Sequence, residues 1–307
     1  MRKHLCLAIG AAFASLAVAQ NNPFLGRWDL TVTTSRDSYP DWIEIQNTAG
    51  GLTARIQPRS GSARMATDVK LQLPHLTLTM APPANGQPAT TWDLTPEGSG
   101  LSGIIKRGDA EAGKIAGVRA PALRRPMPTR WSDPEPIFNG KDLTGWEPIT
   151  PANNHWVVQN GELVNQDHGS NLKSTRKFDD FKLHIEFNCP DKGNSGIYLR
   201  GRYEVQVEYE PIDENDKFHS IGSIYSFLAP AVNLPRKPGT WESFDVTLVG
   251  RWVTIVRDGV KTVDNQEIPG ITGGALDSRE GEPGPFYIQG DHTGGLKYRN
   301  ITVSLPR

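Results

Sequence analysis

The chain has 307 residues and a formal net charge of −1, from 33 basic and 34 acidic side chains. A near-neutral surface lacks the positive field that attracts phosphate groups, so nucleic acid and anionic membrane surfaces are excluded as main partners. The 31 glycines, 24 prolines and 8 tryptophans, with little helical periodicity, are typical of an all-β protein with many turns. The length favours two domains, with one large sandwich as the alternative.

The first residues have the pattern of a secretory signal peptide. Residues 2–4 are basic, residues 5–18 are apolar, and residues 17–19 (AVA) fit a small-x-small cleavage site before Gln20. The apolar run is too short for a membrane anchor. We therefore expect a signal peptide over residues 1–19, and a mature chain without a transmembrane segment that is exported to the periplasm or the extracellular medium.

Removal of this segment leaves Cys189 as the single cysteine of the mature chain, because Cys6 lies within the signal. An internal disulfide and a thiolate metal cluster are therefore excluded. No Cys–His motif accompanies Cys189, so we expect a buried structural thiol.

Residues 20–120 are predicted to form a small β-domain. Short turns such as Gly50-Gly51 and Asn85-Gly86 separate short runs with strand composition. Eight strands in about 100 residues favour a β-barrel or a β-sandwich. The predicted strands are 24–34, 41–46, 52–58, 67–73, 76–80, 90–94, 101–107 and 114–118.

Residues 121–136 contain five prolines and no periodicity, which predicts a semi-rigid linker. Few contacts are expected to cross such a segment. We therefore predict that the second domain, residues 137–307, folds and acts on its own.

The second domain is also rich in predicted strands. Asn160-Gly161 is a two-residue hairpin signal, and residues 181–188 alternate between apolar and polar side chains. Long antiparallel strands with distant pairings favour a concanavalin-like jelly-roll sandwich of the lectin and glucanase kind. The predicted strands are 155–159, 162–166, 181–188, 241–249, 252–257, 260–264, 286–289 and 296–304.

Residues 193–210 (GNSGIYLRGRYEVQVEYE) stand out because they predict two adjacent strands with one strongly polar face. Alternation places Tyr198 and Arg200 on that face of the first strand, and Glu204, Gln206 and Glu208 on that face of the second. Planar hydrogen-bonding groups in register suit a sugar with many hydroxyls. The other interpretation is a solvated surface with cross-strand Arg–Glu pairs.

Six motifs in order resemble one known family. They are FNGKDLTGW (138–146), WVVQNGELVNQ (156–166), FKLHIEF (181–187), GNSGIYLRGRYEVQV (193–207), PGTWESFDVTLVGRWVTIVRDGVKTVD (238–264) and GPFYIQGDHTGGLKYRNITV (284–303). Together they resemble the 3-keto-disaccharide hydrolase domain, also described as a 3-keto-glycoside lyase and 3-keto-2-hydroxyglucal hydratase domain, over about residues 134–306. The resemblance implies a concanavalin-like jelly roll, export, and action on oxidised sugars.

A 3-keto group acidifies the hydrogen at C2, so a base can form an enolate that expels the C1 oxygen, and water can then add. This chemistry needs a base, an electrophile at the ketone oxygen and an acid for the leaving group. We assign His292, in the loop GDHTGG, as the preferred base, with His219 as second choice. Arg200 is predicted to hold the enolate oxygen, and Glu204 and Glu208 to serve as base and acid. The predicted substrate-binding residues are Tyr198, Gln206, Tyr225, Trp241, Gln289 and Asp291.

Two other functions stay open at this point. One is a non-catalytic carbohydrate-binding module, and the other is a conventional glycoside hydrolase with paired carboxylates. No cofactor is indicated with certainty; a divalent metal at the ketone stays open, although no HExxH-like spacing occurs. The predicted partner is a small carbohydrate, and the oligomeric state is left open.

Overall fold

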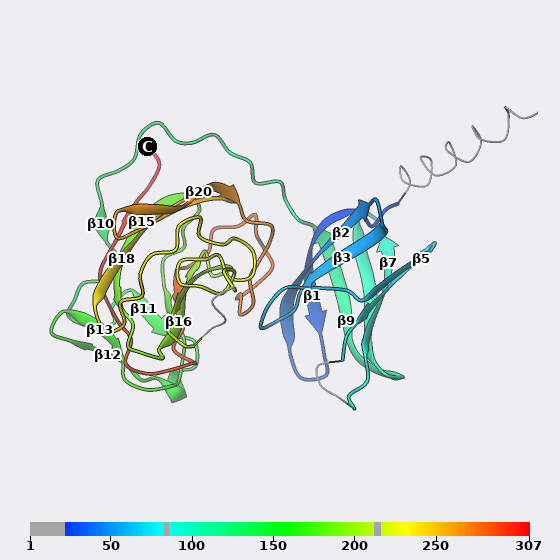
Figure 1. The fold of residues 1–307 in the computed structure, drawn as a ribbon, viewed down its shortest axis with the longest axis horizontal. Coiled ribbons are helices and arrows are strands. Elements are labelled where there is room, and N and C mark those ends of the chain that lie inside the picture. Colours follow the sequence, from blue (N-terminus) through cyan, green and yellow to red (C-terminus); the bar gives the residue numbers. More distant parts are fainter. Residues whose placement is uncertain (1–21, 83–85, 212–215) are drawn as a thin grey trace, which may run out of the picture. The chain divides into compact units, whose positions relative to one another are not determined.

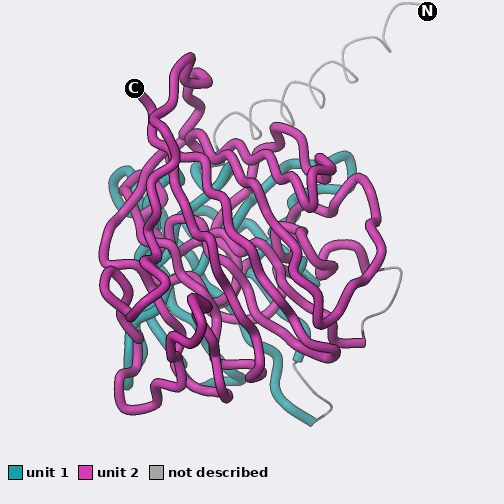
Figure 2. Tube along the Cα trace, turned by 90° about the vertical axis from the view of Figure 1, so that its left-hand side faces the viewer, with its two compact units in different colours: residues 1–56, 64–120 teal, residues 57–63, 121–307 magenta. Residues whose placement is uncertain are grey.

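The computed structural model describes residues 22–82, 86–211 and 216–307, so the predicted signal peptide lies outside the described residues. The chain divides into two compact units. Unit 1 ends at Ala120 and excludes residues 57–63, whereas unit 2 comprises residues 57–63 and 121–307 (Figure 2). Within the described residues, no helix is long and apolar enough to span a membrane.

Unit 1 contains one curled antiparallel sheet of nine strands, in the order β4-β3-β2-β1-β9-β8-β7-β6-β5 (Figure 1). Its buried face is strongly apolar and includes Trp28, Leu30, Ile43 and Leu94. The strands are β1 (Gly26–Thr33), β2 (Ser38–Thr48), β3 (Gly51–Gln57), β4 (Arg64–Met65), β5 (Asp68–Gln72), β6 (His75–Met80), β7 (Thr90–Glu97), β8 (Gly100–Arg107) and β9 (Ala110–Arg119).

Unit 2 contains two antiparallel sheets. The larger sheet has the order β12-β13-β22-β15-β18-β19-β20, with β10 paired to β22. Its strands are β10 (Glu135–Pro136), β12 (Trp156–Gln159), β13 (Glu162–Asn165), β15 (Phe181–Asn188), β18 (Trp241–Val249), β19 (Trp252–Arg257), β20 (Val260–Glu267) and β22 (Lys297–Ser304).

The smaller sheet has the order β11-β14-β21-β16-β17. Its strands are β11 (Trp146–Pro148), β14 (Leu172–Ser174), β16 (Asn194–Leu199), β17 (Tyr203–Glu208) and β21 (Tyr287–Ile288). The short 3-10 helix η1 (Pro151–Asn153) precedes β12. The predicted all-β class with a concanavalin-like sandwich is confirmed.

Apolar side chains between the two sheets of unit 2 form its core. The alternation in β15 buries Phe181, Leu183, Ile185 and Phe187, each at most 2% exposed. Phe181 meets Phe286, next to β21 of the smaller sheet, with ring centroids 4.7 Å apart. Because the apolar sides of both sheets pack against each other in this core, the polar side of the smaller sheet faces away from it and can form a binding site.

Cys189 directly follows β15 and is fully buried, as expected for a structural thiol. Burial raises the pKa of its thiol to about 12. A thiol held protonated at neutral pH is a poor nucleophile.

Candidate active site

A cavity of about 540 Å³ lies over the polar side of β16 and β17, and all of its lining residues belong to unit 2. Most of the lining is polar, which suits a ligand with many hydroxyl groups. The lining residues are Ser60, Gly61, Ser62, Asn194, Tyr198, Glu204, Gln206, Glu208, Glu210, Asp216, His219, Tyr225, Gly273, Gly274, Tyr287, Gln289, Asp291 and His292.

The pairing of β16 with β17 places the polar side chains of the two strands opposite one another. Tyr198 pairs with Glu204, and Asn194 pairs with Glu208. Their apolar neighbours, such as Ile197 and Val205, pair on the same register and are buried. The predicted alternation of this hairpin therefore holds from Asn194 to Leu199 and from Tyr203 to Glu208.

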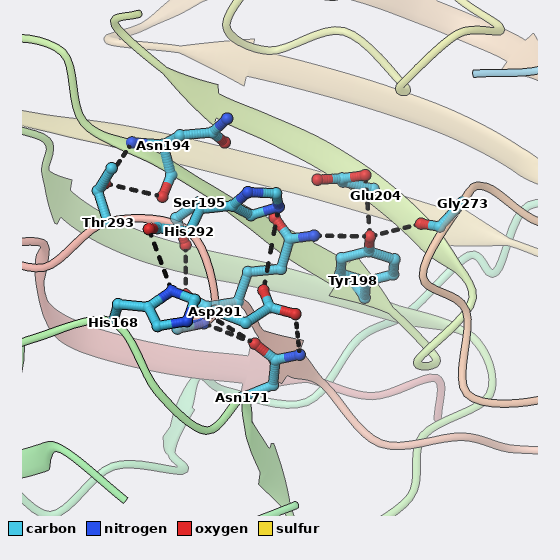
Figure 3. A network of polar contacts seen from close by, with 12 residues as sticks. His168, Asn171, Asn194, Ser195, Tyr198, Glu204, Gly273, Asp291, His292 and Thr293 are labelled. Carbon is cyan, nitrogen blue, oxygen red and sulfur yellow. Dashed lines mark hydrogen bonds and ion pairs between the residues drawn. The ribbon is translucent and has the colours of Figure 1, made fainter. Parts of the chain in front are cut away.

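The hydroxyl of Tyr198 is the centre of a buried hydrogen-bond network (Figure 3). It lies 2.6 Å from the carbonyl oxygen of Gly273, 2.9 Å from Oε2 of Glu204, and 3.0 Å from Nε2 of Gln289. A tyrosine hydroxyl has one proton, and the Gly273 carbonyl can only accept. Every contact is satisfied at once when Tyr198 donates to Gly273 and a neutral Glu204 carboxyl donates to Tyr198.

The environment of Glu204 favours this neutral form. Its side chain is buried, and burial raises the pKa of the carboxyl to about 8. The charges of Glu208 and Asp291 raise it further, and only a hydrogen bond donated by Tyr198 to the carboxylate would lower it. Burial also raises the pKa of Tyr198 well above its usual value. Both groups are thus protonated near pH 7.

Gly196 leaves the space that the Glu204 carboxyl occupies. A Cβ atom at position 196 would lie 2.1 Å from Oε1 of Glu204, a separation that no pair of unbonded atoms tolerates. The absence of a side chain in the middle of β16 therefore determines where the carboxyl lies on the sheet.

Glu208 is the second perturbed carboxyl of the cavity. Burial raises its pKa to about 7, and the charge of Glu210 adds to this, against the hydrogen bond that the Gln206 side-chain amide donates to Oε2 over 2.7 Å. Glu208 therefore changes its charge close to neutral pH.

His292 and Asp291 lie in the loop between β21 and β22, at an exposed side of the cavity. The two side chains are 45% and 47% exposed, and Nε2 of His292 is 3.9 Å from Oδ1 of Asp291. Asn171 fixes the loop, because its side-chain amide donates to Asp291 and its Oδ1 accepts the backbone N–H groups of Gly290 and Asp291 (Figure 3). Sequence reasoning missed Asn171, which follows no recognisable motif.

Comparison with known proteins shows which family this site belongs to. Residues 133–304, more than half of the chain, match the model of the 3-keto-alpha-glucoside-1,2-lyase-like domain. The chain belongs to this family. Membership makes the protein a carbohydrate-active enzyme, and it confirms the resemblance that the six motifs indicated. No curated protein matches the sequence.

Several solved structures are similar to the lyase-like domain. One is a candidate glycosyl hydrolase from Parabacteroides distasonis, with 28% identity and a TM-score of 0.49, covering 59% of this chain and 92% of that one. A second from the same organism has 20% identity and a TM-score of 0.44, covering 54% and 91%. A non-specific endo-β-1,3(4)-glucanase of family GH16 has 11% identity and a TM-score of 0.37, covering 60% of this chain and 94% of that one.

Two predicted site residues lie outside the cavity of the lyase-like domain. Arg200 follows the end of β16 with φ of 53°, which breaks the alternation and turns its side chain into the interior. Its guanidinium is 3.2 Å from Asp179 and donates to the Gly250 carbonyl. The prediction that Arg200 shares the polar face was therefore wrong, since alternation holds only within a strand.

Trp241 also lies elsewhere. It begins β18 of the larger sheet, and the guanidinium of Arg299 lies over its ring at 3.9 Å. Trp241 is therefore not among the residues that line this cavity, and its role in binding a sugar stays a prediction. The other predicted site residues all line the cavity, and Tyr198, Gln206, Tyr225 and Gln289 are among them.

Sequence reasoning missed two residues that hold His219. Nε2 of His219 is 2.6 Å from Oγ of Ser62, and Nδ1 is 2.5 Å from Oδ2 of Asp216. Ser62 is 157 positions from His219, so no local pattern links the two.

Among the described residues, no group of three His, Cys, Asp or Glu side chains is arranged to hold a metal ion.

Proposed function

We propose that the protein is an exported enzyme that cleaves 3-keto-glycosides by β-elimination and then hydrates the product, so that the net reaction is hydrolysis. The observation that carries the proposal is the buried Glu204 carboxyl, held neutral beside Tyr198 in a polar cavity. Membership of the 3-keto-alpha-glucoside-1,2-lyase-like family supports the substrate class.

The reaction balances without a redox step. A base takes the proton from C2, the electron pair forms the enolate of the 3-ketone, and its collapse to the C1–C2 double bond breaks the bond from C1 to the leaving oxygen. The leaving oxygen takes a proton and departs as an alcohol. Water then adds at C1 and a proton returns to C2, which regenerates a 3-keto-sugar.

The neutral carboxyl of Glu204 is the group best suited to the ketone oxygen, in place of Arg200. A buried, protonated carboxyl can donate a hydrogen bond to a developing enolate, and this stabilises the transition state. In the free protein Oε2 of Glu204 lies 2.9 Å from the Tyr198 hydroxyl. The neutral carboxyl donates to that hydroxyl, and a bound ketone oxygen would replace it as the acceptor. His292 at the exposed side of the cavity is the proposed base for C2, with Asp291 beside it, and Glu208 is a second acid–base group.

The spacing of the two carboxyls disfavours a conventional glycosidase. Glu204 and Glu208 are four residues apart in β17, which corresponds to about 13 Å along an extended strand. Inverting glycosidases place their carboxyl pair about 6.5–9.5 Å apart and retaining ones about 5–5.5 Å apart. A buried carboxyl whose pKa lies near 8, in a cavity, favours an enzyme over a purely binding protein, because acid–base groups of active sites are perturbed in this way.

Export is proposed from the pattern of residues 1–19. If it is correct, expression with the full leader in a bacterial host yields a periplasmic or secreted protein whose mass corresponds to a chain starting at Gln20. Recovery of the unprocessed chain in the cytoplasm would contradict export while leaving the catalytic proposal intact.

A comparison of one glucoside with its 3-keto counterpart tests the reaction. We expect the unoxidised glucoside to be inert and the 3-keto form to be cleaved, because only the ketone makes the C2 hydrogen acidic. In deuterium oxide, C2 of the product should carry deuterium. Cleavage of the unoxidised sugar without C2 exchange would establish a glycosidase instead, and binding without turnover of either form would establish a carbohydrate-binding module.

A further inference from the structure

Four side chains of unit 2 form a continuous chain of hydrogen bonds that ends at the cavity. Asp216 is bonded to Nδ1 of His219, and Nε2 of His219 is bonded to Ser62. The Ser62 hydroxyl is in turn 3.3 Å from the hydroxyl of Tyr225. All four residues line the cavity, and Ser62 lies outside the stretch matched by the family model, residues 133–304.

The segment that carries Ser62 is fixed by hydrogen bonds on both sides. The Gln57 side-chain amide donates to the carbonyl oxygens of Pro58 and Gly61, each over 2.8 Å. The backbone N–H of Ala63 donates to Oγ of Ser226, and that of Gly274 donates to the carbonyl of Arg59. Ser62 is therefore held in position by neighbouring groups as well as by His219.

The arrangement allows a proton to move in either direction. When Nδ1 of His219 donates to the Asp216 carboxylate, Nε2 is free to accept from Ser62 in the neutral ring or to donate to Ser62 in the cation. The Ser62 hydroxyl can donate and accept at once, and so can the Tyr225 hydroxyl. The ring of Tyr225 packs edge-on against His219 with centroids 4.6 Å apart, which keeps the two groups together.

We propose that Asp216, His219, Ser62 and Tyr225 form a proton relay that protonates the leaving glycosidic oxygen. This inference rests on the proposed function and assigns the acid that the elimination needs. Tyr225 is the catalytic residue of the four, because it ends the hydrogen-bond chain and lines the cavity. The other three are positioning residues that act through it.

The relay balances over one turnover. During elimination Tyr225 gives its proton to the leaving oxygen and takes one from Ser62, and Ser62 takes one from the His219 cation, which becomes neutral. During hydration the water that adds at C1 gives its proton to Tyr225, and the transfers run back to His219. No proton is gained or lost by the enzyme.

The dependence of the cleavage rate on the leaving group distinguishes the relay from a purely structural role of these residues. Tyr225→Phe and Ser62→Ala each break the relay, so cleavage of an alkyl 3-keto-glucoside should fall by about 10²-fold in kcat/KM. A 4-nitrophenyl 3-keto-glucoside needs no proton on its leaving oxygen, so its cleavage and the C2 deuterium exchange should stay within about threefold of wild type. Ser220→Ala is the matched control, because Ser220 neighbours His219 but its hydroxyl donates to the Lys217 carbonyl.

Each other outcome overturns the relay. Equal losses on both substrates would indicate a disturbed cavity, and unchanged rates on both would show that the leaving oxygen gets its proton elsewhere. Thermal unfolding of each variant confirms that it is folded. Wild-type protein that neither cleaves the two 3-keto-glucosides nor exchanges C2 would overturn the proposed function, and the relay with it, which is a result distinct from the failure of the relay alone.

Discussion

The Glu204 carboxyl is buried and, in its neutral form, donates a hydrogen bond to Tyr198. The protonation of this carboxyl therefore determines how activity depends on pH. Its pKa of about 8 means that the neutral, donating form is lost as the pH rises past that value. We predict that kcat/KM for a 3-keto-glucoside falls above about pH 8 in the wild type. In Glu204→Gln it should be at least about 10²-fold lower and show no such fall. A pH–rate profile of both proteins checks this, and an unchanged alkaline limb in the variant would remove Glu204 from the reaction.

The same carboxyl makes stability depend on pH. Its pKa is raised from 4.5 to about 8 on folding, so the unfolded chain releases the proton more readily between these values. The stability contribution of the neutral group is therefore complete below about pH 4.5 and is lost as the pH rises to about 8, by up to about 1.4 kcal/mol per pH unit. Urea unfolding across this window should show that the free energy of unfolding falls less steeply with pH in Glu204→Gln than in the wild type. The fall that remains in the variant, up to about pH 7, is due to Glu208. Identical slopes would show that Glu204 is ionised in the folded protein.

The burial of Arg200 indicates a role in stability and not in catalysis. Its side chain is 0% exposed and is bonded to Asp179 and to the Gly250 carbonyl. We predict that Arg200→Ala costs about 3 kcal/mol of unfolding free energy, because the Gly250 carbonyl loses its donor and a fully buried side chain is removed, whereas Asp179 keeps its ion pair with Arg125. The kcat/KM of the folded fraction should stay close to wild type. Arg124→Ala on the exposed linker is the matched control and should change stability by less than about 1 kcal/mol. A stable variant that has lost turnover would return Arg200 to the reaction.

At the scale of elements, the hairpin of β16 and β17 shows how far pattern reasoning reaches. Period-two alternation predicted that Tyr198, Glu204, Gln206 and Glu208 share one face, and all four line the cavity. The same rule failed at Arg200, because the strand ends one residue earlier and the backbone turns to positive φ. Residues that meet only through tertiary folding, such as Ser62 and His219, leave no signal in a single sequence.

Gly196 in β16 leaves space for the Glu204 carboxyl of the neighbouring strand β17, and this leads to a prediction for a substitution at that position. An added Cβ would lie 2.1 Å from Oε1 of Glu204, so Gly196→Ala must move the carboxyl away from Tyr198. We expect kcat/KM for a 3-keto-glucoside to fall by at least about tenfold, since misplacing a catalytic group is costly even when the fold survives. Gly50→Ala is the control, because a Cβ there would have its nearest neighbour 3.9 Å away. Full activity in Gly196→Ala would show that the contact with Tyr198 is dispensable.

At the scale of the whole molecule, the sequence predicted the strands better than their partners. Most expected strands of residues 137–307 occur, but β22 at the end of the chain lies between β13 and β15 in the larger sheet. Such pairings join residues more than 100 positions apart, and their register depends on the complete core. The motif order of the family, and not the strand pattern, indicated the sandwich most directly.

The grouping of residues 57–63 with unit 2 leads to a prediction for a truncated chain. The proline-rich linker suggests that residues 121–307 are self-sufficient, and this fragment contains both sheets of the sandwich, so we expect it to fold cooperatively. It lacks Ser62, however, and therefore lacks the hydroxyl that links His219 to Tyr225, so the full activity that the sequence alone predicted for this domain is not expected. Its kcat/KM for an alkyl 3-keto-glucoside should be at least about 10²-fold below that of the full chain, as in Ser62→Ala.

The 4-nitrophenyl 3-keto-glucoside separates this effect from a general loss of the cavity. If Ser62 is the main contribution of residues 57–63, the fragment should cleave this substrate nearly as well as the full chain. A larger loss than in Ser62→Ala, on both substrates, would mean that the segment also shapes the substrate site, which its bonds to Gly274 and Ser226 would explain. A folded fragment with full activity on the alkyl glucoside would show that the sandwich by itself holds the complete machinery, and the relay through Ser62 would then be refuted.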